Sequence, residues 1–299
     1  MFDFKSCAVL LLCVAGALPL SAFSAPPLPV PCDASKLQGA CWKPAIDARW
    51  QYQLQGRGGT AASGNINVNV SAVPYTGGAA VKPSVFDIDL YNPNSDNAVN
   101  TAAVGAIHAA GGKAICYVSA GTWENWRPDA SAFPASVRGR KNGWPGEAWL
   151  DVRQTNILIP IMQARLEKCV SGGFDGVEWD NVDGYSNRTG FPLTAADQTN
   201  YNARLANMTH SAGLTVALKN AVDLVPTLAP YFDYAVNEEC QTYKECGNYS
   251  SNFVQQGKAV FQVEYSGTLA SICSAANQVN RNAIKKSLDL YDTPYAVCR

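Results

Sequence analysis

The chain has 299 residues and a formal net charge of −1, with 47% hydrophobic and 16% charged residues. This length suits one large domain or two small ones, and the composition allows a sizeable core. The sequence has neither a basic face nor a long run of charge, which argues against nucleic acid as a partner. Seven Trp and thirteen Tyr accompany only two His. Flat aromatic rings suit the faces of sugars, although core packing explains most of them.

The first residues have the pattern of an export signal. Lys5 supplies the positive start, residues 8–20 the apolar run, and residues 22–25 the small side chains of a cleavage site. We therefore predict a signal peptide over residues 1–25, a leader and N-terminal loop over 26–48, and one domain over 49–299. The apolar run is too short for a comfortable membrane span. We expect a secreted protein, extracellular or periplasmic, with no membrane span in the mature chain and a monomer as the default state.

Ten cysteines are present, and two of them (Cys7 and Cys13) lie in the predicted signal. An even number in an exported chain indicates disulfides, and eight cysteines allow 105 pairings. Short loops favour the pairs Cys32–Cys41 and Cys240–Cys246, and the position of the tail favours Cys273–Cys298. The two cysteines that remain would form Cys116–Cys169. A zinc site is the alternative. It is disfavoured because the spacings are not short and paired and His is nearly absent, so we expect no metal and no cofactor.

A pattern repeats along the chain, in which a helical stretch ends in Gly and an apolar strand follows. Helical stripes are expected over residues 99–110, 158–169 and 201–212, and Thr194 and Asp197 are spaced like a capping box. Strand and helix alternation implies parallel strands, and eight strands suggest an α/β fold, a closed (β/α)8 TIM barrel in a single domain stapled by disulfides. The expected strands begin at Trp50, Val85, Ala114, Trp149, Gly176, Thr215, Tyr234 and Ala259. Residues 66–70 could add a strand or a side hairpin.

A doubly wound open sheet is the competing architecture. It is disfavoured because no Gly-rich phosphate loop follows the first strand. The two histidines, His108 and His210, stand at the expected last turns of helices, where a positive charge suits the helix dipole. We interpret both as structural.

Barrel enzymes carry their active sites at the C-terminal ends of the strands. The stretch FDGVEWDNVDGY (residues 174–185) holds four carboxylates at such an end. Reading all the strand ends gives an acidic ring, which fits a glycosidase, where two carboxyls flank the scissile bond. It fits a metallohydrolase poorly, and no GxSxG elbow is present. The ring comprises Asp89, Tyr117, Ser119, Asp151, Arg153, Asp180, Lys219, Asn220, Glu238 and Glu264.

The same residues resemble a known family. The chain is similar to the endo-alpha-1,4-polygalactosaminidase family, glycoside hydrolase family 114, over essentially the whole mature chain. The resemblance rests on WQYQLQG (50–56), FDIDLYN (86–92), ICYVSAGTWENWRPD (115–129), GWPGEAWLDVR (143–153), GFDGVEWDNVDGY (173–185), LKNA (218–221), NEECQTYKEC (237–246) and GKAVFQVEY (257–265). It implies a barrel that cleaves an α-1,4-linked, galactosamine-containing polysaccharide.

By this resemblance the catalytic pair falls on Asp180 and Glu238. Our hypothesis makes Asp180 the nucleophile or charged partner and Glu238 the general acid/base. For Asp89, a salt bridge to Lys219 is as well supported as a role in substrate binding. For Trp126, the alternative to substrate binding is core packing. We assign the remaining candidates to substrate binding: Asp89, Tyr117, Ser119, Trp126, Asp151, Arg153, Asp183, Lys219, Asn220, Glu264 and Tyr265.

Two positions depart from the family pattern. Trp179 stands where a small or cyclic residue is common, and Glu239 stands where Gln is usual. Because neighbours on a strand face opposite sides, we expect Glu239 to point away from Glu238. Residues 57–82 also form a longer first crossover than the family needs.

Three other functions are compatible with the sequence. One is a secreted carbohydrate-binding barrel that has lost catalysis. Another is a structural barrel whose acids only satisfy one another, and the third is a glycosidase acting on a different linkage.

Overall fold

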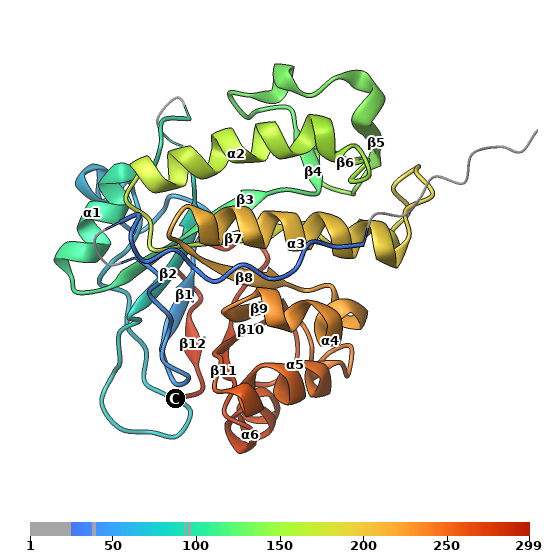
Figure 1. Ribbon diagram of the computed structural model, residues 1–299. Coiled ribbons are helices and arrows are strands. Elements are labelled where there is room, and N and C mark those ends of the chain that lie inside the picture. Colours follow the sequence, from blue (N-terminus) through green and yellow to red (C-terminus); the bar gives the residue numbers. More distant parts are fainter. Residues whose placement is uncertain (1–24, 38–39, 93, 95–96) are drawn as a thin grey trace, which may run out of the picture.

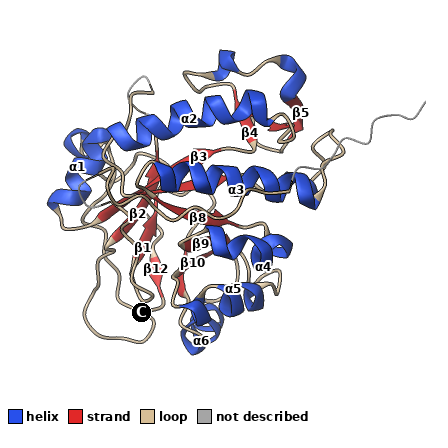
Figure 2. Cartoon of the chain, in the orientation of Figure 1, coloured by secondary structure: helices blue, strands red, loops and turns tan. Residues whose placement is uncertain are grey.

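The structure is a computed structural model and describes residues 25–37, 40–92, 94 and 97–299. Almost all of the predicted signal peptide thus lies outside the described residues. Within the described part of the chain, nine strands form one sheet, curled so that helices cover its outer face (Figures 1 and 2). Eight strands are parallel, and the last is antiparallel to its neighbour. Their order is β1 (Trp50–Tyr52), β2 (Val85–Asp89), β3 (Lys113–Ser119), β7 (Gly176–Asp180), β8 (Thr215–Lys219), β9 (Tyr234–Glu238), β10 (Val260–Glu264), β11 (Asn282–Lys285) and β12 (Ala296–Val297).

Helices connect most of the parallel strands, which confirms the predicted (β/α)8 class. The predicted capping box also forms: Asp197 N donates to Thr194 Oγ1 at 3.2 Å, and Thr194 N donates to the Asp197 carboxylate at 2.9 Å. No helix in the described ranges is long and apolar enough to cross a bilayer. The helices are α1 (Thr101–Ala109), α2 (Thr155–Ser171), α3 (Ala195–Ser211), α4 (Val225–Leu228), α5 (Cys246–Asn252) and α6 (Leu269–Gln278).

The first and last parallel strands, β1 and β11, face each other at the seam of the barrel. Among the described residues they are joined by side chains rather than by a strand ladder. The Trp50 indole donates to the Asn282 carbonyl at 2.8 Å, and the Tyr295 hydroxyl donates to the Trp50 carbonyl at 3.0 Å. These buried polar contacts hold the seam where backbone pairing ends.

One predicted barrel strand was wrong. The strand near Trp149 is β6 (Glu147–Leu150), which pairs antiparallel with β4 (Thr122–Glu124) and β5 (Arg138–Lys141) in a separate small sheet. The segments that join these three strands, residues 125–137 and 142–146, contain no α-helix that could serve as the crossover of a parallel pair. This small sheet lies near the start of α2 (Figure 1). The eighth barrel strand is β11, whose sequence NAIK carries too weak an apolar pattern to stand out.

The long first crossover contains no regular strand at residues 66–70. Its ordered pairing is an isolated bridge between Ala72 and Val81. Ile66 and Val70 are nevertheless buried and pack on the main core. The alternation of apolar residues there reflects the burial of loop side chains and not the formation of a β-strand.

All eight cysteines in the described part of the chain form disulfides, in the four predicted pairs: Cys32–Cys41, Cys116–Cys169, Cys240–Cys246 and Cys273–Cys298. Because the sulfurs are bonded to one another, they are not thiolate ligands for zinc. Cys116–Cys169 ties β3 to the last turn of α2 across the barrel wall.

Both histidines pair with carboxylates at the N-terminal end of the barrel. His108 lies 2.7 Å from Asp175, and His210 lies 2.8 Å from Asp233. They stand in the last turns of α1 and α3, so the structural interpretation agrees with their positions, far from the strand ends that build the cavity described next.

Candidate active site

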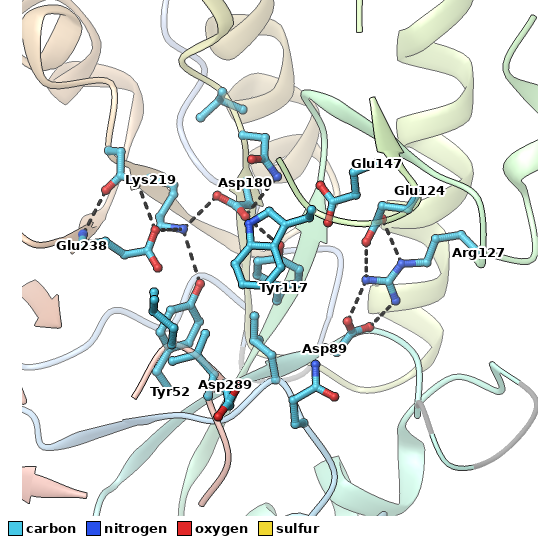
Figure 3. A pocket seen from close by; sticks show the side chains of 18 of the residues that line it. Tyr52, Asp89, Tyr117, Glu124, Arg127, Glu147, Asp180, Lys219, Glu238 and Asp289 are labelled. Atoms are coloured by element: carbon cyan, nitrogen blue, oxygen red, sulfur yellow. Dashed lines mark hydrogen bonds and ion pairs between the residues drawn. The ribbon is translucent and has the colours of Figure 1, made fainter. Parts of the chain in front are cut away.

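A cavity of about 610 Å³ opens at the C-terminal ends of the barrel strands. Its floor is formed by side chains from β1, β2, β3, β7, β8 and β9, and the small sheet supplies one wall. Trp126 and Trp144 stand on that wall and are 42% and 57% exposed. Trp126 is therefore not a core residue. The residues that matter most for the chemistry are Tyr52, Asp89, Tyr117, Asp180, Lys219 and Glu238 (Figure 3). Tyr265 also lines the cavity.

Lys219 lies at the centre of the site. Its ammonium lies 2.8 Å from Asp180 Oδ1 and 3.0 Å from Glu238 Oε2. A third carboxylate, Glu178, lies 3.4 Å below it and accepts a hydrogen bond from the Tyr52 hydroxyl. The side chain of Lys219 is 2% exposed, and the surrounding carboxylates raise the pKa of its ammonium well above the usual value, although burial alone would lower it. Lys219 is therefore a fixed positive charge between the two predicted catalytic acids (Figure 3).

Each of these two acids also accepts a hydrogen bond from a tyrosine. Tyr117 donates to Asp180 Oδ2 at 2.6 Å, and Tyr265 donates to Glu238 Oε1. Burial would raise the pKa of Asp180, but the Lys219 charge, together with hydrogen bonds from Lys219 and Tyr117, lowers it below the usual range. Asp180 is thus held ionised.

The backbone after β7 fixes the position of Asp180. Alternation along β7 places Glu178 and Asp180 on the same inner face. The Asp180 carbonyl accepts from the amides of Ala120 and Gly121 at 2.9 and 3.1 Å. A Cβ at Gly121 would lie 1.6 Å from the carbonyl oxygen of Asn181, so only glycine permits this close approach.

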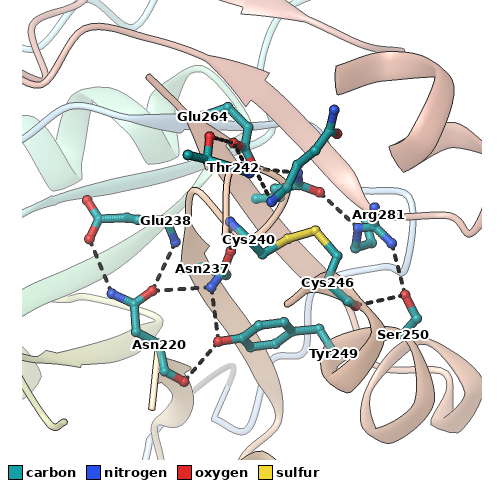
Figure 4. Close-up of a disulfide and its surroundings, with 12 residues drawn as sticks. Asn220, Asn237, Glu238, Cys240, Thr242, Cys246, Tyr249, Ser250, Glu264 and Arg281 are labelled. Atoms are coloured by element: carbon teal, nitrogen blue, oxygen red, sulfur yellow. Dashed lines mark hydrogen bonds between the residues drawn. A yellow bond between two sulfur atoms is a disulfide. The ribbon is translucent and has the colours of Figure 1, made fainter. Parts of the chain in front are cut away.

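Glu238 is positioned by the turn that follows β8. Asn220 has a φ of 43°, and its amide oxygen accepts from the Glu238 backbone at 2.9 Å while its amide nitrogen donates to Glu238 Oε2 at 3.3 Å. Tyr249 supports the turn by donating to the Asn220 carbonyl at 3.0 Å. The Cys240–Cys246 disulfide closes the loop behind this arrangement (Figure 4).

Asp89 forms its salt bridge with Arg127 and not with Lys219, which the sequence had suggested as its partner. Arg127 binds both of its oxygens at 2.7 Å, and the same guanidinium lies 2.8 Å from Glu124. The Lys219 ion pairs are with Glu178, Asp180 and Glu238 instead. The bidentate pair joins the end of β2 to the loop after β4, so Asp89 stabilises the wall of the cavity as well as facing it.

Two further carboxyls at the cavity have raised pKa values. Burial, with the charge of Glu124 adding, raises the pKa of Glu147 to about 7. Burial, with the charge of Asp180 adding, raises the pKa of Asp183 to about 6. Both line the cavity. They can exchange protons or counterbalance a positive ligand near neutral pH.

The structure brings together most of the predicted site residues at this cavity. Those that line it are Asp89, Tyr117, Trp126, Asp180, Asp183, Lys219, Asn220, Glu238 and Tyr265.

Four predicted substrate-binding residues do not line this cavity: Ser119, Asp151, Arg153 and Glu264. Asp151 and Arg153 follow β6, which is not a barrel strand, and they pair with each other at 2.7 Å. Ser119 is buried behind the rim and bonds to Thr122 at 2.6 Å.

Glu264 illustrates how one residue along a strand changes the outcome. The side chains of Phe261 and Tyr265 face into the barrel, so Glu264 faces outward between them. There it accepts from the amide of Gln241 at 2.9 Å and from the hydroxyl of Thr242 at 3.0 Å. Glu264 therefore holds the loop after β9. Glu239 has a φ of 58°, contacts Ser266 at 3.4 Å and is absent from the described cavity lining, as expected for a side chain directed away from Glu238.

Several cavity residues were missed by the sequence reasoning. Tyr52 ends an alternating strand, and that alternation could have placed it on the inner face. Glu124, Arg127, Trp144 and Glu147 belong to the excursion after β3, where no periodic pattern predicts which side chains turn back to the rim. Their only signal in the sequence is that they lie in the segments 115–129 and 143–153, which resemble the family.

The barrel with this acidic, aromatic-lined cavity has the architecture of a glycoside hydrolase. Residues 33–299 match the model of glycoside-hydrolase family GH114, and the chain belongs to that family.

The chain is also similar to solved structures and to one curated relative. Aspergillus fumigatus Ega3, solved in complex with galactosamine, is 34% identical, with a TM-score of 0.71 over 86% of this chain and 97% of its own. The glycoside hydrolase domain of PelA from Pseudomonas aeruginosa shares the fold at 11% identity, with a TM-score of 0.58 over 83% of this chain and 97% of that one. An uncharacterized protein of Deinococcus radiodurans is 26% identical over 264 residues, 79% of each chain.

Proposed function

We propose that this glycoside hydrolase is a secreted, endo-acting enzyme that cleaves α-1,4-linked, galactosamine-containing polysaccharide with Asp180 and Glu238 as its catalytic pair. The observation that carries the proposal is the ammonium of Lys219, which contacts both carboxylates at the floor of an open cavity. Two acids from separate strands that face one point can act on one glycosidic bond.

The geometry favours a mechanism with net retention. Because Asp180 Oδ1 and Glu238 Oε2 both touch one nitrogen, these two oxygens lie no more than about 6 Å apart, nearer the separation of retaining enzymes than that of inverting ones. Asp180, held ionised, attacks the anomeric carbon while Glu238 protonates the departing glycosidic oxygen. Glu238 then takes a proton from water, which displaces the sugar from Asp180.

The charge of the cavity supports a cationic substrate. Carboxylates from the floor, the wall and the rim face the space, while the nearby cations, Lys219 and Arg127, are both engaged in ion pairs. An ammonium-bearing sugar such as galactosamine complements this excess of negative charge. Trp126 and Trp144 offer exposed rings on which sugar faces can stack. The galactosamine in the complex of Aspergillus fumigatus Ega3 is consistent with this substrate class.

Export is supported by the four disulfides, which form and persist in oxidising compartments. Expression of the full chain in a secreting host, followed by N-terminal sequencing of the protein in the medium, tests this part. A mature N-terminus near Ala25 supports export, and an intact N-terminus retained in the cell contradicts it.

Substrate and mode of action are tested by digesting partly deacetylated galactosaminogalactan and reading the products by mass spectrometry. The proposal predicts a ladder of oligosaccharides that contain galactosamine, released early as internal cuts. Fully N-acetylated polymer and neutral α-1,4-galactan serve as matched controls. Cleavage of the neutral polymer alone would contradict the substrate, and binding without any product would identify a carbohydrate-binding barrel instead.

A further inference from the structure

Two carboxyl side chains lie in the barrel interior directly beneath the catalytic layer. Asp87 comes from β2 and Glu178 from β7, each one inward-facing position below Asp89 and Asp180. Both are 0% exposed. They lie within hydrogen-bonding reach of each other. Neither has a place in the mechanism described so far.

The hydrogen bonding around this pair is incomplete if both groups are ionised. Both oxygens of Asp87 and the Oε2 atom of Glu178 have no hydrogen-bond partner among the described residues. Buried oxygens without donors are costly, and two adjacent carboxylates in a low-dielectric interior repel each other. One proton between them removes the repulsion and pairs two of these three oxygens, because a protonated carboxyl becomes a donor.

The surroundings decide which carboxyl carries that proton. Glu178 Oε1 accepts from the Tyr52 hydroxyl at 3.0 Å and lies 3.4 Å from the Lys219 ammonium, and both contacts favour the ionised form. Asp87 has no hydrogen-bond donor or ion-pair partner of its own among the described residues. The proton therefore belongs on Asp87.

We propose that Asp87 is a neutral carboxylic acid that donates to ionised Glu178, and that this pair positions Lys219 between Asp180 and Glu238. An ammonium has three N–H donors. The Tyr52 hydroxyl accepts one of these donors at 3.4 Å, which leaves two for the pair above, and Glu178 holds the ammonium from below as an ion pair at 3.4 Å. Asp87 and Glu178 are thus positioning residues, and this part of the inference rests on the proposed function.

The titration behaviour agrees with the geometry. Burial, followed by the charge of Glu178, raises the pKa of Asp87 well above its usual range. Burial also raises the pKa of Glu178, but the Lys219 charge opposes that rise. The titratable groups that face Asp87 are Glu178, Asp180, Lys219 and the Tyr234 hydroxyl. None of these except Lys219 supplies a positive charge.

Protonation of Asp87 is tested without substrate by infrared difference spectroscopy at neutral pH, with wild type compared with Asp87→Asn. The wild type should show the C=O stretch of a protonated carboxylic acid, and the variant should lack it. An unchanged spectrum in this region would overturn the proposal. Because no turnover is needed, this result stands even if the polymer is not the substrate.

Positioning is tested by kinetics of Asp87→Ala, Asp87→Asn and Glu178→Gln, after thermal unfolding confirms that each folds. Asp87→Ala and Glu178→Gln should lower kcat by about ten-fold or more and move the acid limb of the pH profile upward, and Asp87→Asn should restore most of kcat because its amide still donates. Equal loss in both Asp87 variants, or an unmoved acid limb, would overturn the positioning role. If Glu178→Gln does not fold, Tyr52→Phe can replace it. This variant removes the hydroxyl that contacts both Glu178 and the Lys219 ammonium, and it should move the acid limb in the same direction.

Discussion

Asp180 and Glu238 meet at one ammonium, that of Lys219, at 2.8 and 3.0 Å. The strand order explains this meeting, because β8, which carries Lys219, lies between β7 and β9, which carry the two acids. Neighbouring parallel strands are about 5 Å apart, so the lysine fills the space between carboxylates two strands apart. The distance between the two acids is thus a consequence of barrel topology.

Replacing Lys219 by Met should lower kcat by about 100-fold, because the fixed charge that keeps Asp180 ionised is lost. The buried carboxylates would also lose their counter-ion, so the free energy of unfolding should fall by about 3 to 5 kcal/mol. Steady-state kinetics and denaturant unfolding measure the two effects. Lys113→Met is the matched control. It removes a lysine from an ion pair with Asp175 at the opposite end of the barrel, and it should leave kcat unchanged.

Replacing Tyr117 by Phe should raise the pKa of Asp180, because the hydrogen bond to its ionised form is removed. The active, ionised form would then be lost at higher pH as the solution is acidified. We expect the acid limb of kcat/KM to move upward and the maximal rate to fall by about ten-fold. Tyr231→Phe, which removes a hydroxyl bonded to the Pro27 carbonyl outside the cavity, should not move the profile. An identical profile for both variants would contradict the role of Tyr117.

Replacing Trp126 or Trp144 by Ala should weaken substrate binding with little change in kcat. Each loses an exposed ring at the cavity wall, worth about 1 kcal/mol or about five-fold in KM. Kinetics on galactosamine oligosaccharides of increasing length would show at which length each ring begins to matter. Tyr75→Ala removes a ring of similar exposure outside the described cavity lining and should leave KM unchanged. A fall in kcat with constant KM would count against a binding role.

Replacing Glu147 by Gln should stabilise the protein at alkaline pH. Burial raises the pKa of Glu147 to about 7, so between its unfolded value and pH 7 the folded state binds more protons than the unfolded state. Stability therefore decreases as pH rises through that window. Because the carboxyl still faces solvent in the cavity, which screens part of the effect, we expect a gain of about 1 to 2 kcal/mol at pH 8 and almost none at pH 5.

Thermal unfolding across this pH range measures the difference. Glu167→Gln changes an exposed carboxylate on α2 and should show no such dependence on pH. A stability gain for Glu147→Gln that is equal at pH 5 and pH 8 would show that the cost of ionising the buried Glu147 carboxyl is not the cause.

Much of the fold could be predicted because its signals are local. Strand alternation, glycine after helices and the Thr194 capping box each depend on a few adjacent residues. The eighth strand could not be assigned in this way. The apolar residues near Trp149 form an equally good strand in the small sheet, and the pairing of β11 is set by its neighbours rather than by its own four residues.

The residues of the candidate site also fall into those with a local signal in the sequence and those without one. Asp180, Lys219 and Glu238 end barrel strands, so a rule about strand ends locates them. Glu264 shows the limit of that rule. Its place at a strand end predicts that it lies at the rim of the barrel, but not whether its side chain faces the interior or the outside. Glu124 and Arg127 lie in an excursion whose return to the rim depends on ion pairs such as Arg127 with Asp89. Such long-range pairs leave no periodic trace in the sequence.

The central claim is tested most directly by the activity of Asp180→Asn and Glu238→Gln on partly deacetylated galactosamine polymer, beside Glu167→Gln as a folded control that changes an exposed carboxylate on α2. Each catalytic amide should lower kcat by about 10⁴-fold or more while the thermal unfolding transition remains, and the control should keep near wild-type kcat. Wild-type turnover in either Asp180→Asn or Glu238→Gln would contradict the account.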